Sequence, residues 1–481
     1  MTTQNAFSKH ILFLLLVNLV VKPTYLFIIE VSVQNSLGPK VYGLYFALFN
    51  VTYLFNVLLD LGIQNRATHL LASENESETD MGQILGVKLL LAVGYIITVM
   101  FSALVLGYSG TELIYISLLA FYQSLITLVL YFQAAVTAKE YYWWNTVLSI
   151  LDKTLLIIVL SIFLFIKPFN KELSLTTFIL AQLCTISVTA IVSASVAFQR
   201  QIFTLPQLNI NKVKKLLKQS LPYAAIILLM GCYMRIDGVM LERVLLDGGT
   251  QAGYYAASHR LYAGLNNLGY LFSLLLFPMF IRLSNRRDAL KSLFQESTIS
   301  LIAIGTTAAI FVIFFRTEIM HLLYGQDAVD YGTEALTLLM ITFVMACIVN
   351  VFGTLLTARR QFGPFIRILG VGATLNIALN FYLIPRTGMI GACWSTLICH
   401  VALSGALLFL MRQEIEEKTF LFKTMKLGIY LLMIFLVHFS MKELISERYW
   451  IVSASISLLI SLVLCFQGRF FGTFLWNYSK A

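Results

Sequence analysis

Charged residues are scarce in this sequence. Only 12% of its 481 residues are Asp, Glu, Lys or Arg, about half of the roughly 25% that a soluble domain carries. Apolar residues make up 59%, and they form long blocks rather than the periodic stripe of an amphipathic helix. This composition excludes a soluble enzyme, a nucleic-acid-binding domain and a disordered chain. It predicts an all-α protein that crosses a membrane many times.

Motifs for nucleotide binding and hydrolysis are also missing. The chain has no Walker A sequence, so it is not an ATP-driven pump, and it has neither HExxH nor GxSxG. The cysteines lack CxxC spacing, and all lie in apolar blocks, where they read as packing residues rather than disulfides or metal ligands: Cys184, Cys232, Cys347, Cys393, Cys399 and Cys465. We therefore expect no cofactor, no metal site and no enzymatic activity.

The apolar blocks are long enough to span a bilayer, which takes roughly 20 helical residues. Fourteen spans are predicted: 9–32, 42–63, 84–107, 112–136, 143–166, 173–198, 219–242, 253–281, 295–315, 333–357, 361–383, 388–411, 424–441 and 449–467. If both termini are cytoplasmic, 21 of the 34 Lys and Arg residues fall on inside segments, 8 on outside segments and 5 in the membrane. The positive-inside rule therefore favours this count and this topology.

A weak internal repeat divides the spans. Gly38 and the run from Gly43 to Ala47 match Gly248 and the run from Gly253 to Ala257 at an offset of 210 residues. The run Thr137–Glu140 matches Thr357–Arg360 at an offset of 220. Because six helices separate the matches, the halves have the same orientation and form a parallel repeat.

This repeat predicts four segments of the chain. They are an N-lobe of six spans over 1–198, a basic cytoplasmic linker over 199–218, a C-lobe of six spans over 219–412, and two additional helices with an interfacial tail over 413–481. The lysines of the linker favour contact with anionic lipid headgroups, although they also serve as topology determinants. The aromatic residues of the tail are typical of an interfacial anchor.

Five basic residues lie away from the ends of the predicted spans, and each costs about 2.5–3.5 kcal/mol at mid-bilayer. They are Lys22, Lys153, Arg235, Arg260 and Arg367. The candidate counter-charges are Asp60, Asp152 and Asp237. The excess of positive charge predicts a hydrated cavity that accepts an anion.

The surroundings of these charges leave alternatives open. Lys22 precedes Pro23 mid-span with Asn18 one turn back, so we expect it to line the cavity, although it could reach an interface. Arg260 shares a polar stripe with Gly264 and Asn267.

Arg235 and Lys153 read either as ligands or as structural ion pairs, and Arg367 is close enough to the interface to reach it. Asp60 favours pairing with a basic residue, and Asp237 lies about 200° round the helix from Arg235, too far to pair. His259 and His400 lack a second ligand at metal spacing and favour helix–helix hydrogen bonds.

Several motifs resemble those of one transporter family. Leu37–Tyr45 followed by Leu58–Asn65 resembles the opening of Wzx-type O-antigen flippases, and Arg235–Asp237 with Gly253–Leu261 resembles their seventh and eighth spans. Asn376–Asn380, Leu383–Pro385 and Gly388–Ala392 resemble the turn between their eleventh and twelfth. His69 departs from the family pattern, in which a charged residue is expected. These flippases form, with lipid II flippases and multidrug exporters, the multidrug/oligosaccharidyl-lipid/polysaccharide (MOP) exporter superfamily.

The resemblance implies two six-helix lobes around a cavity lined mainly by spans 1, 2, 7 and 8, on which Lys22, Asp60, Arg235 and Arg260 lie. It implies that the cavity cations bind the pyrophosphate of an undecaprenyl-linked oligosaccharide and move it from the cytoplasmic to the periplasmic leaflet of a bacterial inner membrane. A polysaccharide polymerase and a chain-length regulator are implied as further partners, whereas nucleic acid is not expected.

Two other functions remain open at this point. A cation-coupled drug exporter of the same superfamily needs carboxylates that face cationic drugs, whereas this cavity is net basic. A membrane polysaccharide polymerase needs acidic residues on a large outer loop, and the predicted outer loops are short.

Overall fold

The structure is a computed structural model. It describes residues 17–18, 20–61, 78–139, 141–166, 173–199, 210–414, 417–445 and 447–467. These residues are helical almost throughout and contain no strand, which confirms the predicted all-α fold. The aromatic tail from Phe470 to Tyr478 lies outside the described residues, as do the side chains of the lysine-rich end of the 199–218 segment.

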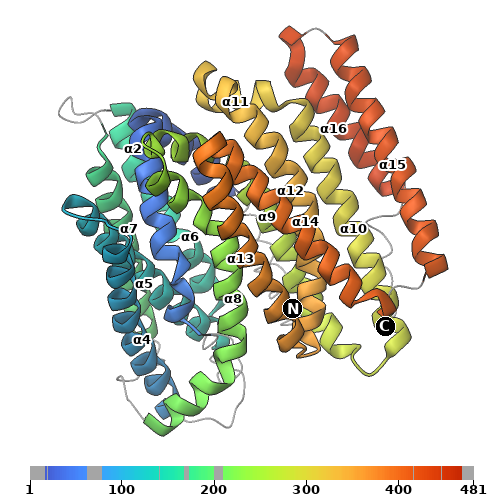
Figure 1. Cartoon of the computed structure of the whole chain (residues 1–481). Coiled ribbons are helices and arrows are strands. Elements are labelled where there is room, and N and C mark those ends of the chain that lie inside the picture. The colour runs from blue at the N-terminus through green and yellow to red at the C-terminus, as the bar shows by residue number, and fades with distance from the viewer. Residues whose placement is uncertain are drawn as a thin grey trace. The chain divides into compact units, whose positions relative to one another are not determined.

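Fourteen α-helices are found in the described part of the chain (Figure 1). They are α2 (Glu30–Leu54), α4 (Glu78–Val105), α5 (Thr111–Ala138), α6 (Tyr142–Ser161), α7 (Leu175–Gln199), α8 (Ile210–Val244), α9 (Gly248–Arg282), α10 (Arg287–Phe314), α11 (Arg316–Tyr324), α12 (Gln326–Ala358), α13 (Phe362–Thr387), α14 (Met389–Leu410), α15 (Glu417–Leu444) and α16 (Trp450–Gln467). Two π-helical stretches also occur, η1 (Tyr25–Ile29) before α2 and η3 (Ile162–Ile166) after α6.

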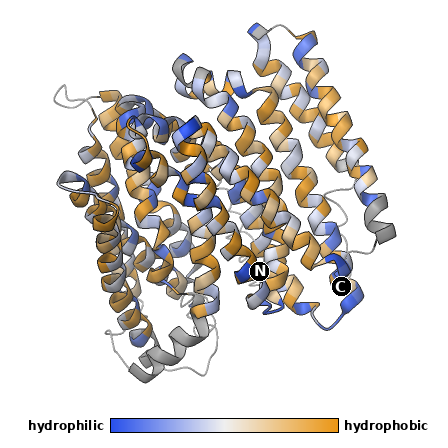
Figure 2. Ribbon diagram, viewed as in Figure 1, coloured by the Kyte–Doolittle hydropathy of each residue, from blue (hydrophilic) through white to orange (hydrophobic). Residues whose placement is uncertain are grey.

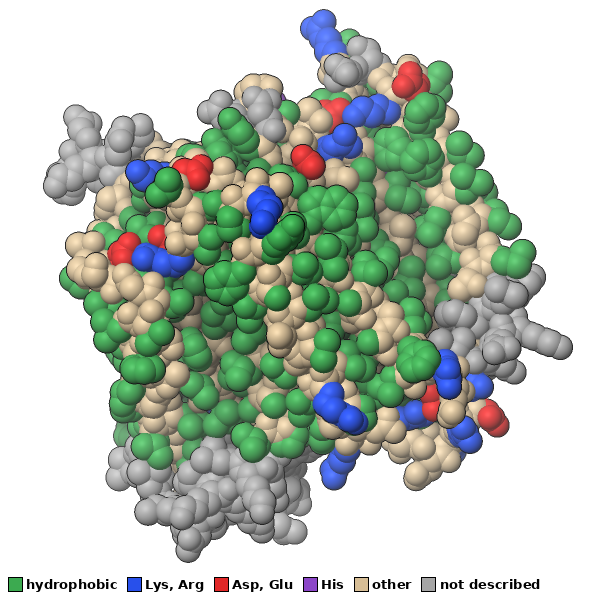
Figure 3. Space-filling view, in the orientation of Figure 1, with side chains coloured by type: hydrophobic (Ala, Val, Ile, Leu, Met, Phe, Trp, Pro, Cys, Tyr) green, Lys and Arg blue, Asp and Glu red, His purple; other side chains and the backbone are tan. Residues whose placement is uncertain are grey.

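Twelve of the predicted spans coincide with apolar helices. Among the described residues, eleven helices are long and apolar enough to cross a membrane, and the last predicted span falls on the shorter apolar stretch Trp450–Cys465. Figure 2 shows the apolar residues along these helices, and Figure 3 shows charged side chains toward the top and bottom of the view with apolar side chains between them. Apolar surface of this extent is compatible with lipid and not with water. The chain is a multi-pass membrane protein.

The boundaries predicted for the first two spans are wrong. A loop was expected over 33–41, but the helix continues there and breaks only at Gly38. Gly38 has a φ of +75°, a backbone angle that glycine adopts readily, and it precedes Pro39. The second span was expected to reach residue 63, but α2 ends at Leu54 and a 3₁₀ turn follows over Asn56–Leu59. Of the first span, residues 9–16 and 19 lie outside the described part of the chain.

The chain forms two compact units, Met1–Gly253 and Tyr254–Ala481. In the first, α5 packs on α4, α6 and α7, and α2 packs on α5, α7 and α8. One of its apolar clusters joins Leu85 and Val87 of α4, Phe132 of α5 and Val196 of α7. The predicted division at 199–218 stays a prediction.

In the second unit α14 packs between α12 and α13, and α10 packs on α12. The two C-terminal helices, α15 and α16, contact each other and α10. Tyr430 of α15 hydrogen bonds to Thr307 of α10 at 2.8 Å. The buried face of α16 carries Ser453, Ser457 and Ser461. Such small side chains let membrane helices approach one another closely.

An ion pair outside the membrane spans ties the last helices to the core of the second unit. The Arg359 guanidinium, just after α12, donates to both carboxylate oxygens of Glu414 at 2.7 and 3.1 Å. These hydrogen bonds lower the pKa of Glu414 below its ordinary value, helped by the charges of Arg359, Arg287 and Lys291. A depressed carboxyl pKa stabilises the fold above the unfolded pKa, and the stabilisation is lost as the pH falls through the folded pKa.

We therefore expect Glu414→Gln to reduce the stability of the detergent-solubilised protein at pH 7 by about 1 kcal/mol. The difference from the unaltered protein should shrink as the pH is lowered below about 4.3, the ordinary pKa of Glu. Thermal unfolding across pH 3–8 measures this, with the exposed Glu443→Gln as control. Destabilisation that is equal at all pH values would contradict this assignment.

Candidate substrate site

The N-terminal helical segment presents Lys22 on an exposed surface. Pro23 follows it and cannot donate a backbone hydrogen bond, and the helix widens into the π-helical turn η1 directly afterwards. The helix therefore leaves α-helical geometry two residues after this proline. It turns Tyr25 inward, where it is buried, while Lys22 stays accessible.

Lys153, in the middle of α6, lies close to this segment. Its ammonium is 2.9 Å from Asp152 Oδ2 and donates to the Tyr122 hydroxyl of α5 at 3.3 Å. It also lies over the ring of Tyr25, 4.8 Å from the centroid, in a cation–π contact. Three elements therefore position this one cation.

The Asp152 carboxylate is held from two sides. Besides Lys153, the Thr185 hydroxyl of α7 donates to Asp152 Oδ1 at 3.1 Å. One turn before Lys153, Ser149 accepts a hydrogen bond from the Asn18 amide at 3.1 Å. The structure thus brings four predicted site residues together in the first unit: Asn18, Lys22, Asp152 and Lys153.

This group carries more positive than negative charge. The ammonium groups of Lys22 and Lys153 are close enough to repel each other. Asp152 compensates Lys153, and among the described residues no carboxylate pairs with Lys22. The group, which we call the basic cluster, can therefore bind an anion at Lys22.

The other predicted residues of the first unit lie in separate contacts. The Arg235 guanidinium of α8 stands over the ring of Tyr53 of α2 at 4.5 Å. Asp60 pairs with Lys88 of α4 at 2.7 Å, and the Lys88 side chain is almost completely buried. Asp237 is buried at 1% exposure. Because α2 ends at Leu54, Tyr53 and Asp60 do not lie on one continuous helix.

Two predicted site residues belong to the second unit. Arg260 is buried, and its guanidinium donates to the Tyr324 hydroxyl at the end of α11 at 2.6 Å. Asn267 is exposed two turns further along α9.

The histidines of the second unit make helix contacts. His400 Nδ1 lies 2.8 Å from the Thr396 carbonyl, which can only accept, so Nδ1 carries the proton. In the neutral ring Nε2 then accepts from the Tyr262 hydroxyl at 3.4 Å, which joins α14 to α9. His259 stacks with Tyr255 and contacts Tyr262.

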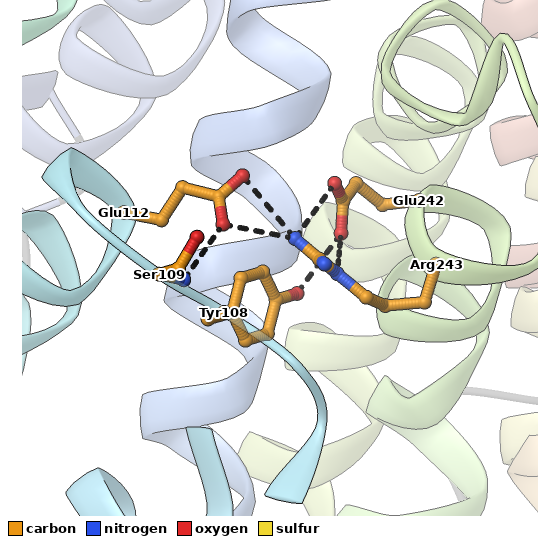
Figure 4. Close-up of polar contacts among 5 residues, drawn as sticks. All are labelled: Tyr108, Ser109, Glu112, Glu242 and Arg243. Atoms are coloured by element: carbon orange, nitrogen blue, oxygen red, sulfur yellow. Dashed lines mark hydrogen bonds and ion pairs between the residues drawn. The ribbon is translucent and has the colours of Figure 1, made fainter. Parts of the chain in front are cut away.

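A polar cluster that sequence reasoning missed joins three helix ends (Figure 4). Arg243 Nε donates to Glu242 at 2.7 Å, and its terminal nitrogen reaches both oxygens of Glu112 at 3.3 Å. The Tyr108 hydroxyl donates to Glu242 at 3.0 Å, and its ring lies 3.6 Å from the guanidinium carbon. Burial and the neighbouring Glu242 carboxylate raise the pKa of Tyr108, which keeps this donor protonated. We call these four residues the Arg243 cluster.

The residues that sequence reasoning did not identify differ in how far the sequence could have revealed them. Lys88 is a charge a few residues inside an apolar block, and that position could have identified it as the partner of Asp60. Glu112, Glu242 and Arg243 stand at the ends of apolar blocks, where topology alone explains them. Tyr122 and Thr185 carry no sequence signal. Within the part of the chain that the structure describes, no group of three His, Cys, Asp or Glu side chains could hold a metal ion.

Residues 7–284, more than half of the sequence, match the family model described as "Polysaccharide biosynthesis protein". The chain belongs to this family. A comparison with curated proteins finds no match.

Solved structures similar to this member of the polysaccharide biosynthesis family are transporters. A lipid II flippase MurJ in an inward closed conformation has a TM-score of 0.73 at 15% identity, covering 95% of this chain and 98% of that one. An inward-facing multidrug resistance MATE transporter of the MOP superfamily has a TM-score of 0.63 at 14% identity, covering 81% and 94%. A MOP superfamily transporter from Pyrococcus furiosus has a TM-score of 0.57 at 14% identity, covering 84% and 94%.

The family model places the chain among polysaccharide biosynthesis proteins. Its fold is the one shared by a lipid II flippase and by MATE transporters of the MOP superfamily, in agreement with the fold that the sequence resemblance implied.

Proposed function

We propose that the protein is a flippase that moves an undecaprenyl-pyrophosphate-linked oligosaccharide, the repeat unit of an O-antigen or another surface polysaccharide, across a bacterial inner membrane. Both termini are cytoplasmic in this proposal, and the headgroup travels from the cytoplasmic to the periplasmic leaflet by alternating access. The observation that carries the proposal is the basic cluster, whose exposed Lys22 is not compensated by a carboxylate among the described residues.

The chemistry of the cluster favours a pyrophosphate over other headgroups. A pyrophosphate offers several acceptor oxygens, and Lys donates to such oxygens as a flexible point charge. The neighbouring amide of Asn18 adds a polar group that suits sugar hydroxyls. Lys153 is already held by Asp152 and Tyr122. It therefore adds positive electrostatic potential at the site, while Lys22 is the residue that contacts the pyrophosphate.

A cation-coupled drug exporter is the alternative function, because multidrug MATE transporters share this fold. A site for a cationic drug needs carboxylates that are free to face it. Asp60 and Asp152 each hold a lysine in this structure, at 2.7 and 2.9 Å. The charge balance therefore favours an anionic substrate.

Deletion of the gene tests the proposal. We expect the deletion strain to lose its surface polysaccharide and to accumulate the lipid-linked oligosaccharide in a form that a periplasmic glycosidase cannot reach until the inner membrane is opened. Its susceptibility to ethidium and other cationic drugs should be unchanged. Normal polysaccharide together with drug hypersensitivity would overturn the proposal in favour of the exporter.

Partners follow from the same proposal. The flipped repeat unit would be consumed by a polysaccharide polymerase with its chain-length regulator, and the predicted basic cytoplasmic segments would contact anionic lipids of the inner membrane.

A further inference from the structure

Glu30, the first residue of α2, is a carboxylate inside a membrane helix. By the predicted boundaries it stands close to the end of the first span, at residue 32, where a charge needs no explanation. In the structure the helix continues to Gly38, so Glu30 lies about two turns before the break. A charge at that depth is costly against lipid and marks a polar surface within the protein.

The Glu30 carboxylate is oriented by a buried tyrosine. The Tyr42 hydroxyl donates to Glu30 Oε1 at 2.8 Å. Tyr42 is itself buried, and its ring contacts that of Tyr45, whose hydroxyl accepts from the Gln182 amide of α7 at 2.8 Å. Packing therefore fixes the donor. Because a carboxylate has about four acceptor sites, a carboxylate oriented in this way can still accept hydrogen bonds from a ligand.

Glu30 is also within reach of the side chains around the basic cluster. The Tyr122 hydroxyl, which accepts from Lys153, lies close enough to Glu30 for an electrostatic interaction, and so does the buried Tyr25. Lys22 and Glu30 are separated by roughly 12 Å along the helix, at about 1.5 Å per residue. One segment of the first unit therefore carries a cation at Lys22 and an anion at Glu30, a distance apart that a pyrophosphate with a short oligosaccharide can bridge.

We propose that Glu30 determines sugar specificity: it accepts hydrogen bonds from neutral or amino sugars of the substrate and rejects acidic sugars. This inference rests on the proposed function, because a pyrophosphate bound at Lys22 leaves the oligosaccharide to face Glu30. Hydroxyl and ammonium groups are donors that suit a carboxylate. A uronic acid would instead place a second carboxylate beside it, and like charges brought together at a binding surface repel strongly. Specificity then comes from a repulsive element as well as an attractive one.

Flipping of two matched lipids tests this specificity. Proteoliposomes contain undecaprenyl pyrophosphate that carries either a neutral hexose disaccharide or the same disaccharide ending in a uronic acid. No membrane potential is applied, because the additional charge of the uronic acid would change the driving force. The unaltered protein should flip the neutral lipid at least about tenfold faster. Glu30→Gln removes the charge and keeps the shape, so it should lose most of this preference, whereas Glu30→Asp should retain it. Glu443→Gln, at an exposed carboxylate of the second unit, is the control.

The outcomes separate this inference from the proposed function. If the unaltered protein does not prefer the neutral lipid, or if Glu30→Gln keeps the preference, Glu30 does not recognise the sugars, and the flippase proposal stands. If Glu30→Gln stops flipping of both lipids, Glu30 serves the fold or the transport step, and the inference is again wrong. A protein that flips neither lipid overturns the substrate class proposed here, and the deletion strain then decides whether the flippase proposal fails with it.

A second measurement does not depend on transport. Glu30→Cys, in a variant whose six native cysteines are replaced by alanine, is labelled with a maleimide. The neutral lipid-linked disaccharide, at about ten times its Kd, should slow the labelling about tenfold, because only unbound protein reacts. Undecaprenyl pyrophosphate without sugars should leave the rate unchanged. Ser36→Cys, exposed further along the same helix, is the matched control and should react at one rate throughout. Equal protection of Glu30→Cys by both lipids, or protection by neither, would contradict the assignment of the sugars to Glu30.

Discussion

Replacing Lys22 with alanine is expected to abolish surface polysaccharide while leaving the amount of protein in the membrane near normal. The side chain is exposed beside the buried Tyr25 and makes no ion pair within the described residues, so its loss removes little packing. It removes the cation that we propose binds the pyrophosphate. Hydrogen bonds to charged groups contribute about 1.5–3 kcal/mol each, so binding should weaken by roughly ten- to a hundredfold or more.

Arg260→Ala should cause the same loss, because we propose that Arg260 also binds the pyrophosphate. Its guanidinium is hydrogen bonded to Tyr324 in this structure, so a packing role must be separated from a binding role. Tyr324→Phe does this, since it removes the hydroxyl and keeps the cation. If Arg260 binds substrate, Tyr324→Phe retains polysaccharide.

Arg367→Ala is the control for both substitutions. Arg367 is exposed on α13, and within the described residues its side chain donates a hydrogen bond to the Gly363 carbonyl of its own helix. Surface polysaccharide is measured by complementation of the deletion strain, and protein by immunoblotting. Full complementation by Lys22→Ala and Arg260→Ala would refute the proposed pyrophosphate site.

Membrane potential alone should accelerate flipping strongly. The pyrophosphate carries at least two negative charges, and the cell interior is negative, so outward movement is downhill. The gain is about 2.3 kcal/mol per charge per 100 mV, or roughly 4–5 kcal/mol for two charges. Such a difference corresponds to about a thousandfold in the equilibrium between leaflets. The cations of the basic cluster stay in the protein and do not cancel this transfer.

The ion pairs argue against an obligatory coupling ion at two of the three aspartates. Asp60 is held by the buried Lys88, and Asp152 by Lys153 and Thr185. A carboxylate engaged in this way is not available to a sodium ion or a proton without first breaking its pair, which is costly for buried charges. Asp237, also buried, is the third aspartate in question.

Proteoliposomes with a potassium-diffusion potential, and with neither sodium nor a pH gradient, provide the measurement. Valinomycin without a potassium gradient is the matched control. Flipping of undecaprenyl-pyrophosphate-linked oligosaccharide should follow the sign of the potential. If it ignores the potential and follows a sodium or proton gradient instead, the electrophoretic mechanism is wrong. Asp60→Asn, Asp152→Asn and Asp237→Asn would then identify the coupling site.

Most of the fold could be predicted because a bilayer imposes length and polarity on each helix. Twelve spans from residue 84 onward coincide with apolar helices. The first two failed at their boundaries, because one glycine in a left-handed conformation can join two helices without a loop. The end of α2 at Leu54 could not be predicted either, because the residues of the 3₁₀ turn that follows are as apolar as those of a membrane helix.

The candidate site could be predicted in its charges and in the neighbouring Asn18, but not in the side chains that hold them. Lys22, Lys153 and Asp152 were found because charge inside an apolar block is expensive and therefore needs a reason. Tyr122 and Thr185, which hold Lys153 and Asp152, could not be found, because a tyrosine or a threonine in a membrane helix is too common to carry information. The Arg243 cluster was missed because charges at helix ends already have an explanation in topology.

The sequence by itself determined that this protein is an all-α, multi-pass membrane protein with an excess of positive charge inside its spans, because hydropathy and charge cost act on each helix separately. Its internal offset of 210 residues was also readable. Only the tertiary structure decided which charges neutralise each other and which remain available, as with Lys153 on Asp152 and the uncompensated Lys22. It alone placed Gly43 against Gly249 and Gly253 against Pro39, because backbone contact between distant segments leaves no trace in composition or period.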